Sequence, residues 1–275
     1  MIDCKALGPV ALALVAFLTS PGCDETPDPI DGSVVQRIAL GDAIDSPALT
    51  LVGVTIDAAS GQRFVLDANS GIYSLDDAGV ATQFLALEDF PSPDVGLRSG
   101  WQDFAAMGDG TFALIAVGDG FRLDTEEQTL EQWFCYEPGW MDPEQFAQTS
   151  ENLAYDPVTD RIFSAPLTLD SFAEDEVTRA DVATFDGAGA GDLSWFPLSD
   201  VNVSFGGMAL EADGSVLLAT ADLLFRYTLG ETALQELGSL SEHGIEMVQG
   251  MMIDPATGHL QVLDGSDNEL VVLDF

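Results

Sequence analysis

The sequence has very few basic residues: 8 lysines and arginines stand against 47 aspartates and glutamates, which gives a formal net charge of −39. Lys5 is the single lysine. A surface of this charge repels nucleic acid and anionic lipid headgroups, which excludes both as electrostatic partners. The acids are spread along the chain, as is typical of a solvated exterior that resists aggregation, and multivalent cation binding is the alternative interpretation. We expect a monomer with no nucleic acid partner.

Cysteine and histidine are scarce as well, at three and two residues. If Cys4 is removed with a leader peptide and Cys23 is modified, Cys135 is the one cysteine that remains, so no intramolecular disulfide is expected. Cys135 lies in an apolar stretch, where a small buried residue is the ordinary role. His243 and His259 are not part of a cluster of three or four ligands, which excludes a typical zinc site.

Catalytic sequence motifs are absent. The chain contains no GxSxG, no HExxH, no P-loop and no GxGxxG after a strand. These absences favour a non-enzymatic protein.

The longest apolar run, ALGPVALALVAFL near the N-terminus, is too short to span a bilayer and is typical of a signal-peptide core. Ser20 and Gly22 precede Cys23, and this stretch resembles a degenerate bacterial lipobox, with Ser20 at the usual leucine position. The resemblance implies that residues 1–22 are a lipoprotein signal peptide and that Cys23 is the lipidated first residue. A plain secretory signal is the alternative. We therefore expect an exported protein of the bacterial cell envelope, with a lipid anchor in a membrane.

An acidic, proline-rich stretch, DETPDPIDGS, follows Cys23 directly. Its composition predicts a tether over residues 23–32, as a surface anchor needs. We expect this tether to pack against nothing.

One hairpin pattern recurs along the rest of the chain. MMIDPATGHLQVLD (251–264), VTIDAASGQRFVLD (54–67) and LAYDPVTDRIFSAP (153–166) each join two apolar strands through an Asp-led turn, and two shorter versions lie near residues 110 and 214. The turns end in a residue suited to the left-handed conformation. These residues are Gly61, Gly110, Asp160, Gly214 and Gly258.

Two further strand-like runs follow each hairpin, except that the fifth hairpin is followed by a single run, ELVVLDF. The missing strand is available in SVVQRIALGD at residues 33–42, where we expect Val35, Ile38 and Leu40 to be buried. Repeats of about 40–50 residues with four strands each predict an all-β fold with a single β-propeller over residues 33–275. We predict five four-stranded blades and a ring closed by the N-terminal strand. Six blades result if residues 150–200 contain an extra blade.

The DPxTG turn followed by LxVLD resembles bacterial propellers of the NHL, YncE-like and SMP-30-like kind. The resemblance covers nearly all of the chain after the leader and implies a fold while leaving the function open. The Gly-His and Trp-Asp signatures of WD40 repeats are missing.

Loops that lead into the innermost strands of a propeller meet at one mouth of its central channel. In this sequence they offer polar side chains as channel-mouth or ligand-binding candidates: Asp103, Glu151, Asn152, Asn202 and Gln249. Similarity to SMP-30-like lactonases implies that Asp103, Glu151 and Asn152 hold a divalent metal, and hard oxygen ligands suit calcium. Trp101 and Trp140, each in a Gly-Trp loop context, are candidate exposed contact residues, whereas Trp133 and Trp195 are expected in outer strands.

The leading hypothesis is a non-enzymatic envelope lipoprotein whose propeller binds a protein or glycan partner and needs no cofactor. The alternative is a calcium-dependent lactonase-like hydrolase in which Asp103 or Glu151 serves as the base.

Overall fold

The computed structural model of the chain describes residues 30, 32–46, 48–91, 100–116, 119–135, 146–170, 178–186, 194–198, 205–231 and 233–275. The regular secondary structure of these residues is almost entirely β-strand. In chain order the strands are β1 (Ser33–Ala39), β2 (Leu51–Ile56), β3 (Arg63–Asp67), β4 (Gly71–Leu75), β5 (Ala81–Ala86), β6 (Trp101–Gly108), β7 (Thr111–Ala116), β8 (Asp119–Asp124), β9 (Thr129–Cys135) and β10 (Phe146–Asp156). They continue with β11 (Arg161–Asp170), β12 (Thr178–Asp186), β13 (Ser194–Pro197), β14 (Gly207–Leu210), β15 (Val216–Ala219), β16 (Leu223–Tyr227), β17 (Gln235–Ser239), β18 (Val248–Ile253), β19 (Leu260–Asp264) and β20 (Glu269–Asp274).

Within the described residues, helical structure is limited to short 3-10 turns such as η1 (Leu87–Asp89) and η3 (Ser241–His243). Within the described ranges, no helix has the length and apolar character needed to cross a membrane.

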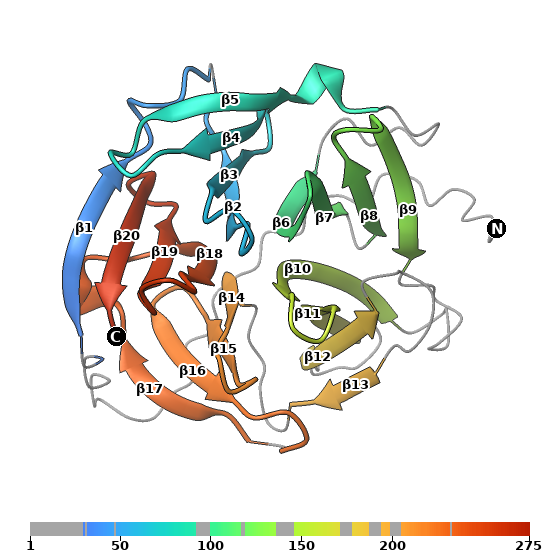
Figure 1. Ribbon diagram of the computed structural model, residues 1–275. Helices are drawn as coiled ribbons and strands as arrows, with labels where there is room; N and C mark the ends of the chain where they lie inside the picture. Colours follow the sequence, from blue (N-terminus) through green and yellow to red (C-terminus); the bar gives the residue numbers. More distant parts are fainter. Residues whose placement is uncertain are drawn as a thin grey trace.

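The strands pair into four-stranded antiparallel sheets, with the orders β2-β3-β4-β5, β6-β7-β8-β9, β10-β11-β12-β13, β14-β15-β16-β17 and β1-β20-β19-β18. Figure 1 shows these sheets around a common centre, with β2, β6, β10, β14 and β18 innermost. Each of these inner strands contacts the next one, and β18 contacts β2. The prediction of an all-β fold with a propeller-like arrangement of four-stranded sheets is thereby confirmed. Trp133 and Trp195 lie in the outermost strands β9 and β13, as predicted.

The predicted turn chemistry is also confirmed. Gly61, Gly110, Gly214 and Gly258 have φ between 73° and 89°, and Asp160 has φ 52°. Asp57, Asp156 and Asp254 begin the longer turns, and in each the carboxylate accepts the backbone N–H two residues ahead at 2.8–3.0 Å. The repeated sequence is therefore a repeated Asx turn that reverses the chain between the first two strands of a sheet.

The N-terminal strand completes the sheet that contains the C-terminal strand. β1 pairs antiparallel with β20 from Ser33 opposite Asp274 to Ala39 opposite Glu269. Ile38 and Leu40 are buried, as predicted. The prediction for Val35 is wrong: a register shift between Val34 and Gln36 takes this residue out of the ladder, and its side chain is 53% exposed.

The hydrophobic core is divided into clusters that lie between neighbouring sheets. One cluster joins the last sheet to the first, with Leu263 and Leu270 packed together with Leu51 and Val65. All four side chains are fully buried, and each buried aliphatic side chain of this size stabilises the fold by about 1.5–3 kcal/mol. The strands second from the centre, such as β3, β7 and β19, are buried along their length, whereas β5, an outermost strand, is largely exposed.

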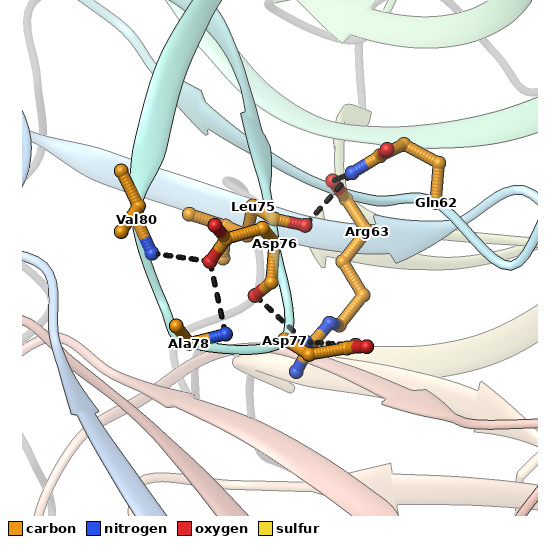
Figure 2. A network of polar contacts seen from close by, with 7 residues as sticks. All are labelled: Gln62, Arg63, Leu75, Asp76, Asp77, Ala78 and Val80. Carbon is orange, nitrogen blue, oxygen red and sulfur yellow. Dashed lines mark hydrogen bonds and ion pairs between the residues drawn. The ribbon is translucent and has the colours of Figure 1, made fainter.

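A polar network at the turn between β4 and β5 uses one of the few cations (Figure 2). Arg63, which is buried, donates to the Asp76 carbonyl at 2.8 Å and to the Asp77 carboxylate at 3.0 Å. Gln62 donates to the Leu75 carbonyl at 2.7 Å, and the Asp76 carboxylate accepts two amides of its own turn at 2.9 and 2.8 Å. The network ties β3 to the turn that leads into the outermost strand of its sheet.

One residue of the predicted tether packs against the folded domain. Ile30 is 3% exposed and packs in the cluster that contains Leu217 and Leu240. Its N–H donates to the Ser239 carbonyl at 3.3 Å. The expectation that residues 24–32 pack against nothing is therefore wrong for Ile30, because this aliphatic side chain covers the gap between β17 and the last sheet.

Two truncations test the role of β1. Deleting residues 33–42 removes a paired strand together with Ile38 and Leu40, so we expect Tm to fall by roughly 10 °C or more. Deleting residues 24–29 leaves Ile30 in place, and we expect Tm to change by less than about 2 °C. Equal melting temperatures for the two truncations, measured by calorimetry, would show that β1 contributes nothing to the integrity of the fold.

Candidate functional site

The inner strands surround a cavity of about 80 Å³ on the central axis, lined mainly by apolar side chains together with Thr55 and Tyr155. Val54 of β2, Ala106 of β6, Leu153 of β10, Met208 of β14 and Met251 of β18 are among its lining residues. We call the end of this channel where the chain enters the inner strands the loop end. The opposite end, where the inner hairpins turn, is the hairpin end.

The loop end lies just ahead of the cavity along the inner strands. Here the inner strands carry Gly53, Asp103, Asn152, Gly207 and Gly250. In β2, β6 and β18 this residue directly follows a bulge in the ladder to the second strand. Three of these five residues are glycines, so the side chains of Asp103 and Asn152 fill the space between the inner strands at this level.

Asp103 lies where three inner strands meet. Its Oδ1 accepts the N–H of Phe104 at 2.8 Å, and its Oδ2 accepts the N–H of Leu153 in β10 at 2.7 Å. A Cβ atom at Gly53 of β2 would overlap the Asp103 carboxylate, so glycine is required there. The carboxylate thus joins β6 to β10 and fills the space left by β2.

Asn152 makes the equivalent connection on the next strand. It is 1% exposed, and its Nδ2 donates to the carbonyl of Phe205, just ahead of β14. At Gly206 a side chain would collide with the Val248 carbonyl of the last sheet. Polar side chains and glycines therefore hold the inner strands at close distance around the loop end.

Burial changes the acidity of Asp103. The side chain is 3% exposed, and desolvation raises the pKa of the carboxyl well above its usual value, while the hydrogen bonds from Leu153 and Phe104 oppose this shift. The raised pKa means that the neutral form is favoured by this environment.

The hairpin end is the more accessible end of the cavity. Ile56, Tyr155 and Ile253, the lining residues nearest the turns, are partly exposed, whereas Val54 and Leu153 are buried. Tyr155 donates from its hydroxyl to the Asp160 carboxylate at 2.9 Å. A ligand that reaches the cavity from the described surface would meet the hairpin turns first.

The predicted channel-mouth residues are brought together only in part. Asp103 and Asn152 lie on adjacent inner strands at the loop end, and Gln249 lies in the bulge of β18, with its side chain beside Gly265. Glu151 belongs to β10, but its side chain is outside the described residues. Cys23, Asn202 and Trp140 also lie outside the described residues.

The expectation that Trp101 is an exposed contact residue is wrong. Its side chain is 4% exposed and packs edge-on against Phe121 and beside Phe90, with ring centroids 5.7 Å away in both cases. The loop context concealed that Trp101 is the first residue of β6, where it joins the cluster between the first two sheets.

The described side chains do not offer calcium an open set of oxygen ligands. Both carboxylate oxygens of Asp103 already accept backbone N–H groups, and Asn152 is bonded to Phe205. In the described part of the chain, no three His, Cys, Asp or Glu residues gather as a metal site would require. The calcium site with Asp103, Glu151 and Asn152 stays a prediction, because the Glu151 side chain is not described.

Two structural carboxylates were missed by the sequence reasoning. Asp67 accepts the N–H of Thr50 at 2.7 Å, and Asp264 accepts the N–H of Met247 at 3.2 Å. Each fully buried carboxylate stands at the end of the second strand and binds the amide ahead of the first strand of the same sheet. The shared VLD ending of the two repeats was the available signal.

Comparison with known proteins gives no family. No protein-family model matches the chain, and no curated protein matches it. Among solved structures, the extracellular domain of a hybrid two-component system from B. thetaiotaomicron is 13% identical, with a TM-score of 0.48, over 83% of this chain and 28% of that one. The extracellular domain of a one-component system from the same organism is 12% identical, with a TM-score of 0.43, over 90% of this chain and 40% of that one. The chain thus spans well under half of either protein.

The direction of the Asp103 pKa shift can be tested through the pH dependence of the free energy of unfolding. Because its folded pKa lies above the unfolded value of about 4, its protonation favours folding; this contribution is complete below pH 4 and is lost as pH rises through the folded pKa. We expect the wild type to exceed Asp103→Asn in unfolding free energy by about 1–3 kcal/mol at low pH, since the variant loses an acceptor for a buried N–H, and the difference to shrink as pH rises. Urea unfolding across pH measures it, with Asp267→Asn as an exposed control. A difference that grows with pH would contradict the assigned direction.

Proposed function

We propose that the protein is an exported lipoprotein of the bacterial cell envelope whose propeller is a non-enzymatic scaffold for binding a partner. In this proposal residues 1–22 are the signal peptide, Cys23 carries the lipid, the following residues up to 32 are the tether, and residues 33–275 are the binding domain. The non-enzymatic role is supported by the structural hydrogen bonds that Asp103 and Asn152 make. Both polar side chains at the loop end join neighbouring sheets through backbone groups, and this packing role accounts for their presence.

The calcium-dependent hydrolase is kept as the second candidate. Its support is that Asp103 and Asn152 lie on adjacent inner strands at one end of the channel, with Leu153 bonded to Asp103. In this alternative Glu151 completes the ligand set, and calcium polarises an ester carbonyl when bound.

The lipid anchor is tested at Cys23. We expect Cys23→Ala to move the protein from the membrane fraction to the soluble exported fraction, because the thioether-linked lipid is the sole attachment in this proposal. Metabolic labelling with a fatty acid analogue should mark the wild type and Cys135→Ala, and not Cys23→Ala. Equal labelling of wild type and Cys23→Ala would refute lipidation at this residue.

Calorimetric titration of calcium into metal-stripped protein separates the two candidate functions. We expect no tight one-to-one binding, because Asp103 and Asn152 are engaged by backbone groups. Tight binding that is abolished by Glu151→Ala and kept by Glu242→Ala, a matched exposed control, would favour the hydrolase instead.

A further inference from the structure

The hairpin end of the channel is surrounded by carboxylates. Every inner hairpin places an acid in its turn, and all of them are exposed or partly exposed: Asp57, Asp109, Asp156, Asp213 and Asp254. The first two of these turns lie close together, since the Asp57 carboxylate is within 3.8 Å of the Cβ position at Gly108 in the second hairpin. We call these five acids the hairpin acids.

The arginines near this end are already engaged. Arg226 makes two hydrogen bonds to the Glu211 carboxylate, at 2.5 and 2.6 Å, and Arg63 is held by Asp76 and Asp77. Arg226 also attracts the Asp213 carboxylate, and Arg161, at the start of β11, donates to the Thr184 hydroxyl at 2.7 Å. The five hairpin acids outnumber Arg63, Arg161 and Arg226, each of which has another partner, so this end keeps an excess of negative charge.

Tyr155 lines the cavity at the hairpin end, where its hydroxyl is bonded to Asp160. Burial raises its pKa to about 12, with further contributions from the hydrogen bond to Asp160 and from the charges of Asp160 and Asp156. The open end of the apolar cavity is thus both electronegative and partly sheltered from water.

We infer that the hairpin end is a docking site for a basic segment of a protein partner. One aliphatic side chain of the partner enters the cavity against Val54, Leu153, Met208 and Met251, and flanking lysines or arginines lie beside the hairpin acids. The inference rests on the proposed scaffold function and names the surface and the partner chemistry for it. A recess lined mainly by apolar side chains, in a surface with an excess of negative charge, favours this combination, because the recess supplies contact area and the charge supplies steering.

Charge complementarity favours a basic partner over a second copy of the chain or its own tether as the occupant of the hairpin end. A second copy of a chain with net charge −39 is repelled, and so is the acidic tether DETPDPIDGS. The cavity is small, at about 80 Å³, which suits an anchor side chain rather than a large ligand.

Fluorescence anisotropy with short labelled peptides tests the inference on the exported domain. We expect end-blocked Lys-Lys-Leu-Lys-Lys to bind, and Lys-Lys-Ser-Lys-Lys to bind roughly tenfold more weakly, because the serine cannot fill the apolar recess. Glu-Glu-Leu-Glu-Glu should not bind.

Matched variants test whether the peptide binds at the hairpin end. The triple variant Asp57→Asn, Asp156→Asn, Asp254→Asn keeps the turn acceptors and removes three charges, and we expect affinity to fall roughly tenfold. A control with the same loss of charge elsewhere on the surface, Glu242→Gln, Glu246→Gln and Asp267→Asn, should change affinity less than about twofold. Ala154→Phe, which fills the cavity, should also weaken binding while the melting temperature verifies folding.

Three outcomes would overturn the inference. These are no binding of the leucine peptide, equal affinity for the serine peptide, or equal losses in the two triple variants, which would indicate general attraction to an acidic protein. None of them touches the scaffold proposal, which the calcium titration and the Cys23 fractionation test independently.

Discussion

Each sheet of this protein presents hydrophobic side chains on both faces, so each needs a neighbour on both sides. The buried clusters lie between successive sheets, and the one that contains Leu51 and Leu270 joins the first sheet to the last. An open row of such sheets would leave two apolar faces in water, at a cost of about 25 cal/mol for each Å² exposed. The cyclic contact of the inner strands follows from this constraint, and so does the channel at their centre.

The same constraint explains the loop end. Inner strands that pack this closely need glycine where another backbone or carboxylate approaches, as at Gly53 and Gly206. Asp103 and Asn152 then supply acceptors and donors for backbone groups that would otherwise be buried without partners. Polar residues at a channel mouth are thus consistent with a structural role, and among the described residues that line the cavity the more exposed ones lie at the hairpin end.

Local patterns predicted local structure well. The Asp-led turns with Gly61, Asp160 and Gly258 were readable because the conformation depends on residues within one short segment. The burial of Trp101 and Ile30 was not readable, because it depends on Phe121 in one case and on Leu217 in the other, in strands that sequence spacing does not place. The exposure of Val35 depends on a single bulge, and the cavity on side chains from all inner strands.

The pairing of β1 with β20 joins residues at opposite ends of the described chain. As the chain leaves a ribosome or a membrane pore, residues 33–39 have no partner until residues 269–274 also emerge. Their contacts have a very high sequence separation, so we expect this closure over a long loop to come late in folding. Until that step the apolar edge of β20 is open to pairing with other chains, and the strong self-repulsion of this acidic sequence keeps the waiting chains apart.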